Sequence, residues 1–205
     1  MHKRSGSAMI LLGLVLIMAS LCLTGYNIWE NHRANQSTVN TVDFLHTEIK
    51  AAADDPVSSI PETVIPDYIL NPDMEMPVLE YEGEAYIGTL EIPALDLCFS
   101  TISEWSDAAL KKSPCRYSGS AYKGNFVIAA HNYWAHFGKL ENLVIGDTVI
   151  FTDVDGNVFT YEVAAKEILI PTAVEEMKRD EWDLTLFTCT LGGANRVTIR
   201  CDRIQ

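Results

Sequence analysis

Basic residues and cysteine are both scarce in this 205-residue chain. Its 15 Lys and Arg face 28 Asp and Glu, and the resulting net charge of −13 excludes a general basic surface for nucleic acid. Five cysteines are too few, and an odd number, for a disulfide framework. With 48% hydrophobic and 21% charged residues, the chain is not disordered as a whole. Its length suits one domain with an appendage.

The N-terminal region contains one long uncharged segment, residues 8–26. As a helix rising about 1.5 Å per residue, it nearly spans the ~30 Å hydrocarbon core of a membrane. Lys3 and Arg4 precede it and Glu30 follows it, which predicts that residues 1–7 are cytoplasmic and the remaining chain is extracellular. The alternative is a cleaved signal peptide, but the segment is long for one and no A-x-A site closes it. We therefore predict a retained single-pass anchor in the cell membrane.

Residues 27–80 are expected to connect this anchor to a folded domain. Residues 27–52 place apolar side chains at rough helical spacing, which predicts a helical stalk or packing helix. Most of the chain's eight prolines lie between positions 56 and 77, and at that density they favour an extended linker. A plain spacer is the preferred interpretation, and a segment that folds across the domain is the alternative.

Residues 81–205 have the texture of an all-β domain. Short runs rich in Val, Ile, Thr, Tyr and Phe alternate with Gly, Pro, Asn and Asp, and Asp155-Gly156-Asn157 indicates a hairpin turn. The predicted strands are 86–93, 95–99, 125–131, 147–153, 158–170, 184–190 and 196–204. Two short helices are expected near 105–112 and 173–179. Closely spaced strands with few helices predict one β-barrel or sandwich.

Three residues at strand ends depart from a plain β domain. His131 follows a buried apolar strand, although taken alone it is best interpreted as a structural histidine. Cys189 lies at the end of the candidate strand 184–190, beside a glycine turn, where an unpaired thiol in an exported protein suggests use rather than burial. Arg196 opens the last strand, and alternation puts Arg200 on the same face, where we expect an exposed, solvated charge.

These three side-chain types together suit acyl transfer. A thiol needs a neighbouring base or cation to become a thiolate, and a histidine can supply this and later protonate a leaving amine. An arginine can hold a carbonyl or stabilise the oxyanion. Cys189 and Arg196 must lie close together because one turn joins their strands, whereas His131 must be brought in by the fold.

The order of these motifs resembles the sortases, the cysteine transpeptidases of Gram-positive cell surfaces. The family's strand ending in T-L-x-T-C is matched by residues 185–189, and the arginine that opens its final strand by Arg196. The strand that ends in the family's catalytic histidine is matched by residues 130–132, and its first barrel strand by residues 87–93. The resemblance covers roughly residues 85–205.

The resemblance implies a closed eight-stranded barrel with a His131, Cys189 and Arg196 site. Cys189 would attack the Thr–Gly bond of an LPXTG-like sorting signal, and an amine from a peptidoglycan precursor or a pilin would resolve the thioacyl enzyme. Thr188 and Asn132 are expected to bind substrate. Arg200 is the competing arginine. No cofactor is implied, and the partners are surface proteins and, through the anchor, a membrane.

Some assignments stay open. Residues 55–57 read Asp-Pro-Val and lack the aromatic residue of the lid motif that pilin-polymerising members often carry. The alternatives to a transpeptidase are a catalytically silent adhesion barrel and a cysteine protease that hydrolyses the same acyl-enzyme. His131 and His136 are five residues apart, which is not a recognised metal-ligand spacing. The other thiols outside the anchor, Cys98, Cys115 and Cys201, are either buried and free or partly joined in a disulfide.

Overall fold

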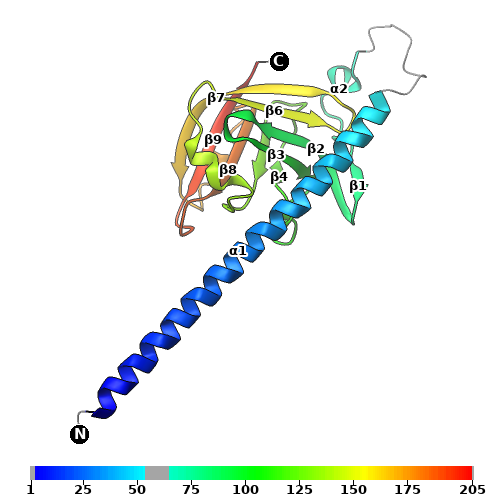
Figure 1. Cartoon of the computed structure of the whole chain (residues 1–205). Helices are drawn as coiled ribbons and strands as arrows, with labels where there is room; N and C mark the ends of the chain where they lie inside the picture. Colours follow the sequence, from blue (N-terminus) through cyan, green and yellow to red (C-terminus); the bar gives the residue numbers. More distant parts are fainter. Residues whose placement is uncertain (1–2, 54–64, 205) are drawn as a thin grey trace. The chain divides into compact units, whose positions relative to one another are not determined.

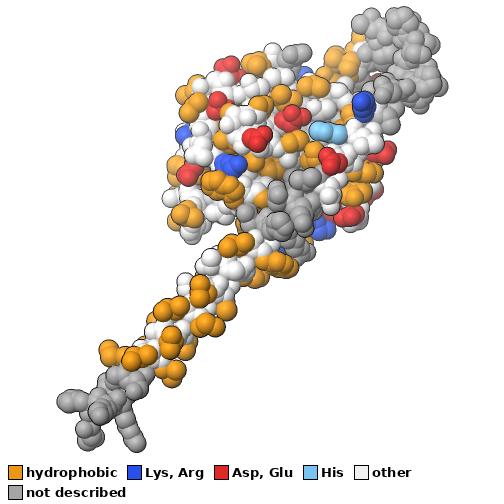
Figure 2. All heavy atoms as spheres, viewed as in Figure 1, with side chains coloured by type: hydrophobic (Ala, Val, Ile, Leu, Met, Phe, Trp, Pro, Cys, Tyr) orange, Lys and Arg blue, Asp and Glu red, His pale blue; other side chains and the backbone are white. Residues whose placement is uncertain are grey.

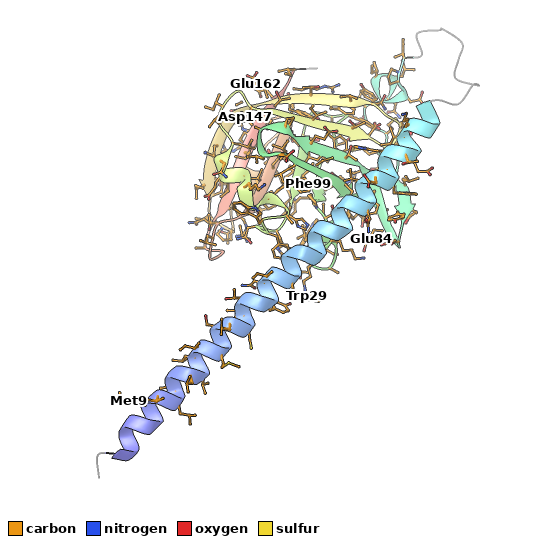
Figure 3. All side chains as sticks on the ribbon, viewed as in Figure 1. Met9, Trp29, Glu84, Phe99, Asp147 and Glu162 are labelled. Carbon is orange, nitrogen blue, oxygen red and sulfur yellow. The ribbon has the colours of Figure 1, made fainter. Side chains whose placement is uncertain are left out.

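The computed structural model describes residues 3–53 and 65–204, in two compact units, residues 1–33 and 34–205. The first unit is the N-terminal part of helix α1 (Lys3–Ala53). Its segment Met9–Trp29 has a mean hydropathy of 2.2 and no buried residue, and its ends are marked in Figure 3. Figure 2 shows hydrophobic side chains along this part of the helix. The segment is long and apolar enough to cross a membrane, and a signal sequence would meet the same criteria of length and composition.

The second unit contains a closed barrel (Figure 1). Its strands are β2 (Glu84–Ile92), β3 (Leu97–Ile102), β4 (Cys115–Ser118), β5 (Phe126–Ala129), β6 (Thr148–Asp153), β7 (Val158–Leu169), β8 (Leu184–Cys189) and β9 (Arg196–Arg203). They are ordered β2-β3-β4-β5-β8-β9-β7-β6, and β6 pairs with β2 to close the ring. A short strand, β1 (Leu79–Tyr81), extends β2 at the edge. The predicted eight-stranded barrel is confirmed.

Along each strand, successive side chains alternate between the barrel core and its outer face. On β6, Val149 and Phe151 point inward and are fully buried, while Ile150 and Thr152 are only partly buried. The same pattern turns Leu184 and Leu186 of β8 inward. The interior is filled by aromatic and branched side chains, and residues 155–157 make the predicted turn between β6 and β7.

Helical turns between strands are shorter than expected. The stretch predicted near 105–112 contains only the 3₁₀ turn η3 (Ala109–Lys111), and the one near 173–179 contains α3 (Val174–Met177). Two further 3₁₀ turns, η2 (Pro93–Leu95) and η4 (Phe137–Asn142), and strand β4 were not predicted. Strand β4 has four residues, too few for a period-two pattern to stand out.

The segments before the barrel pack against it. On α1, Leu45 is fully buried beside Tyr86 and Ile102, and the ring of Phe44 stacks on Tyr81 with centroids 4.2 Å apart. The predicted packing helix is therefore present at this end of α1.

Residues 65–78 are not a plain spacer. They begin with α2 (Asp67–Leu70), whose Tyr68 stacks on Tyr122 at 4.7 Å, and they bury Met76 in the barrel core. The alternative of a segment that folds across the domain applies here, because apolar side chains between the prolines provide anchors. Residues 55–57 lie outside the described residues.

Candidate active site

Cys189 is the last residue of β8 and its side chain is half-buried. In the antiparallel pairing of β8 with β9, its Cα partner is Arg196. Side chains of directly opposed residues project to the same face with Cβ atoms about 4.5–5.5 Å apart. The side chains of Cys189 and Arg196 therefore leave adjacent positions on the outer face of the barrel.

His131 is brought to the same level by the parallel pairing of β5 with β8. Ala129 is the Cα partner of Phe187, and the Ala130 amide continues the pairing by donating to the Phe187 carbonyl at 3.2 Å. His131 and Cys189 each come two residues after this aligned pair, so the ends of β5 and β8 carry them at the same level of the barrel. The fold thus makes the long-range juxtaposition that the sequence left open.

Thr188 and Asn132 hold these strand ends together. The Thr188 hydroxyl, 2% exposed, donates to the Ala130 carbonyl at 2.8 Å, and the Asn132 amide Nδ2 donates to the Thr190 carbonyl at 3.3 Å. Each bond fixes a residue adjacent to His131 against a residue adjacent to Cys189. Both side chains position the site, and contact of either with substrate stays a prediction.

The loop after His131 is tightly folded around aromatic rings. Tyr133 packs on His131 with ring centroids 4.8 Å apart and on His136 at 5.5 Å. His136 is fully buried, and burial together with the nearby His131 lowers its pKa to about 4. His136 is therefore neutral at physiological pH. The sequence suggested His136 only as a possible metal ligand, and its packing role was not predicted.

Arg196 is oriented by the turn between β8 and β9. Its Nη1 donates to the Gly193 carbonyl at 3.2 Å and to the Asn195 carbonyl at 3.1 Å. The turn is closed by Thr190 and Asn195, whose backbones are bonded at 2.9 Å, and Gly193 lies at a φ of 78° that favours glycine. Among the described residues, backbone carbonyls and no carboxylate hold the guanidinium group at the rim of the site.

Arg200 is buried, contrary to the expectation of a solvated charge. It is fully enclosed and donates to the Glu167 carboxylate at 3.0 Å, the Thr185 hydroxyl at 3.0 Å, and the carbonyls of Glu176 and Met177. Alternation placed its side chain on the correct face, but α3 covers that part of the outer face. Its partner on β8 is Thr185, four residues before Cys189, so it lies at the far end of the strand pair.

An apolar strip runs along the outer face toward the thiol. Val127, Ala129, Phe187 and Met177 of α3 are buried together there, and Tyr117 of β4 packs edge-on against Phe187 at 5.1 Å. Phe187 and Cys189 are two residues apart on one strand and share this face. The site is therefore bordered by apolar side chains on the β5 side of Cys189 and by Arg196 on the β9 side.

The other cysteines have different surroundings. Cys115 and Cys201 are buried, and desolvation raises the pKa of the Cys115 thiol to about 12 and that of Cys201 still further. Cys98 is half-buried, and all three are free thiols, so the possible disulfide is absent among these residues. Cys189 differs from Cys115 and Cys201 in combining partial exposure with a histidine and an arginine on the same face.

Comparisons with known proteins identify the family and similar folds. A family model described as the sortase domain matches residues 90–204. Sortase C1 from Streptococcus suis is 27% identical, with a TM-score of 0.51 over 58% of this chain and 73% of that one. Sortase A from Corynebacterium diphtheriae is 21% identical, with a TM-score of 0.54 over 90% and 96% of the two chains. Sortase C from Streptococcus pneumoniae is 23% identical, with a TM-score of 0.52 over 78% and 88%. No curated protein sequence matches the chain significantly.

Proposed function

The chain belongs to the sortase family, and from this we propose that it is a membrane-anchored cysteine transpeptidase with Cys189 as nucleophile, His131 as acid and base, and Arg196 as the group that stabilises the oxyanion. The observation that carries the proposal is the strand register, which sets Cys189 opposite Arg196 and level with His131. These are the three groups that acyl transfer through a thioester requires.

The proposed reaction has two halves. The Cys189 thiolate attacks the threonine carbonyl of an LPXTG-like sorting signal, the C–N bond to glycine breaks, and His131 gives its proton to the leaving amine. An acceptor amine, from a peptidoglycan precursor or a pilin, then loses a proton to His131 and attacks the thioester. The Cys189 thiolate is released and a new amide bond forms.

The surroundings of the three residues support these roles. Within the described residues, the hydrogen bonds of the Arg196 side chain use only Nη1, so Nε and Nη2 remain available to a substrate oxygen. The apolar strip that ends at Phe187 is suited to the apolar residues at the start of such a signal.

The segment Met9–Trp29 supports the anchoring part of the proposal. Basic residues before it and an acid after it favour a cytoplasmic N-terminus and an extracellular barrel. Sorting signals and cell-wall or pilin amines are extracellular groups, so this topology places the enzyme on the side of its substrates.

The test is capture of the acyl-enzyme. The full-length chain in detergent is incubated with a panel of quenched fluorescent LPXTG-like peptides, with and without an amine acceptor, and analysed by intact-mass spectrometry. We expect a thioacyl adduct on Cys189 that disappears when the acceptor is added. Cys189→Ala should form no adduct, whereas the matched control Cys22→Ser should behave like the parent chain. A folded parent chain that forms no adduct with any peptide, or an adduct that persists in Cys189→Ala, overturns the assignment.

A further inference from the structure

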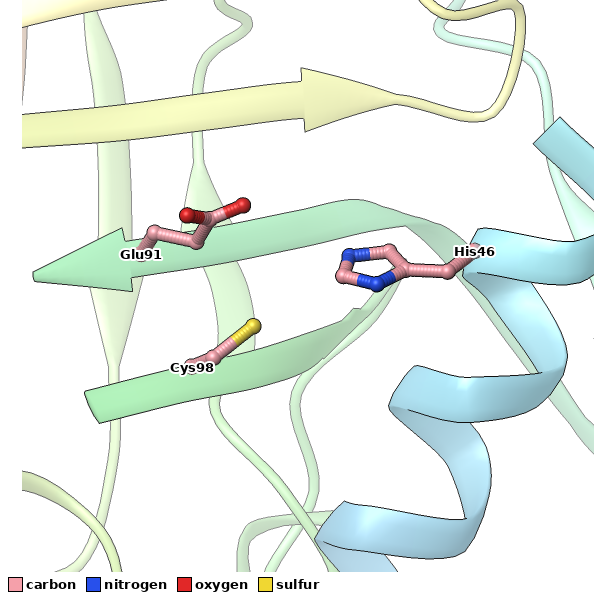
Figure 4. Close-up of side chains that lie close together, drawn as sticks. All are labelled: His46, Glu91 and Cys98. Atoms are coloured by element: carbon pink, nitrogen blue, oxygen red, sulfur yellow. The ribbon is translucent and has the colours of Figure 1, made fainter. Parts of the chain in front are cut away.

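Three side chains of metal-binding type meet where the C-terminal end of α1 lies on β2 and β3. His46 of α1, Glu91 of β2 and Cys98 of β3 point toward a common centre (Figure 4), and their ligand atoms all lie within 4.8 Å of one another. Within the side chains that the structure describes, no other group of three His, Cys, Asp or Glu residues meets this condition. The group contains one nitrogen, one oxygen and one sulfur donor.

The fold holds each donor in place. Glu91 and Cys98 are Cα partners in the antiparallel β2–β3 pair, so their side chains project from the same face of the barrel as neighbours. Their neighbours on either side, such as Leu90 and Phe99, point into the core. His46 follows Leu45, whose burial against the barrel fixes this turn of α1. The three residues come from elements whose packing does not depend on a ligand.

The charge around this centre favours a cation. Besides Glu91, the nearby part of α1 contributes a second carboxylate, that of Asp43. Asp43 lies one helical turn before His46 and therefore on the same face of α1. No Lys or Arg among the described residues forms an ion pair with either carboxylate. The acids are left without a counter-charge.

We propose that His46, Glu91 and Cys98 bind a divalent transition-metal ion, for which zinc is the best fit, with Asp43 or water completing the coordination. Imidazole, carboxylate and thiolate are the ligands that zinc takes, whereas calcium and magnesium prefer oxygen alone. Tetrahedral bonds of 2.0–2.3 Å would bring the donor atoms to roughly 3.3–3.7 Å from one another. Rotation of the exposed His46 side chain and the half-buried Glu91 side chain supplies this adjustment, and Cys98 releases its proton to solvent on binding.

The ion would join α1 directly to two strands of the barrel. The centre lies on β2 and β3. Of the proposed catalytic residues, His131 follows β5, Cys189 ends β8 and Arg196 opens β9, and β4 lies between β3 and β5 in the sheet. The metal site is therefore separate from the transpeptidase assignment. Its role is structural: it fixes the C-terminal part of α1 to the catalytic domain.

Metal binding is tested on the full-length chain in detergent, in a Cys189→Ala background because a Cys–His pair in the active site can also bind zinc. After chelator treatment, Zn²⁺ is titrated by calorimetry and Co²⁺ by absorption spectroscopy. We expect one equivalent to bind, with a thiolate-to-cobalt charge-transfer band. At a hundredfold excess over Kd, Zn²⁺ should raise Tm by roughly 5–10 °C.

Substitutions identify the ligands. Cys98→Ser should abolish the charge-transfer band and the rise in Tm, and His46→Gln or Glu91→Gln should weaken binding at least tenfold. The matched controls Cys22→Ser and Glu80→Gln should bind like the parent, and the metal-free Tm of every variant establishes that it is folded. Absence of saturable Zn²⁺ binding by the folded parent, or a cobalt band that survives Cys98→Ser, overturns the proposal.

Discussion

Replacing Arg196 by methionine should lower catalytic activity, whereas replacing Arg200 by methionine should lower the free energy of unfolding. Arg196→Met removes a guanidinium group that is bonded only to turn carbonyls at the rim of the site. Its unfolding free energy should change by less than about 1 kcal/mol. Loss of an oxyanion donor typically costs 10²–10³-fold in rate, so kcat for peptide cleavage should fall by about that factor.

Arg200→Met should have the opposite effect. It leaves two buried acceptors, the Thr185 hydroxyl and the Met177 carbonyl, without their donor, at about 1 kcal/mol or more each, and it also removes the donor to the part-buried Glu176 carbonyl. Glu167 has a side chain 37% exposed and regains water, and burial of the guanidinium is no longer a cost. The net loss is about 2–4 kcal/mol, which corresponds to a Tm lower by roughly 5–15 °C.

The assay pairs urea denaturation with cleavage of a fluorescent sorting-signal peptide at a temperature where both variants are folded. We expect Arg200→Met to retain kcat within a few-fold and Arg196→Met to lose it. Full activity in Arg196→Met together with loss of activity in folded Arg200→Met would refute the reasoning, since it would assign the catalytic charge to the buried residue.

Three further predictions concern the loop after β5 and its supports. The pKa of His136 is lowered to about 4 in the folded protein. Its contribution to the free energy of unfolding is therefore complete above about pH 6.5 and is lost as pH falls toward 4. His136→Phe should flatten this pH dependence of the urea midpoint. Thr188→Val should lower the free energy of unfolding by about 1 kcal/mol, because the Ala130 carbonyl loses its donor. It should also lower kcat more than it changes KM, because the adjoining loop loses its register. An unchanged kcat would contradict this. Gly138→Ala should reduce activity in the folded enzyme, because a Cβ there would lie 2.7 Å from backbone oxygens of the loop, whereas Gly83→Ala in an open turn should leave activity unchanged.

Periodicity was sufficient to predict most of the barrel. Long strands such as β6 and β7 carry enough alternating residues to be recognised, and the turn at residues 155–157 has an unambiguous composition. The linker was harder to predict because proline excludes regular structure without excluding packing. Residues 65–78 show this, since Met76 is buried in the core although prolines surround it.

The candidate site was predictable where the chain itself enforces proximity. One turn joins the strands of Cys189 and Arg196, so their pairing follows from sequence distance. The place of His131 depends on β5 running parallel to β8, a long-range pairing that local patterns do not encode. Here the order of motifs in a known family supplied what periodicity could not.

The burial of Arg200 shows a limit of alternation as a predictor of environment. Period two identifies which of two faces a side chain occupies, but whether the outer face meets water depends on what the rest of the chain lays over it. Helix α3 covers the part of this face around Arg200 and leaves the end with Cys189 open. The same strand therefore carries one buried arginine that holds the fold together and one partly exposed arginine, and the distinction arises from a four-residue helix that the strand's own sequence does not reveal.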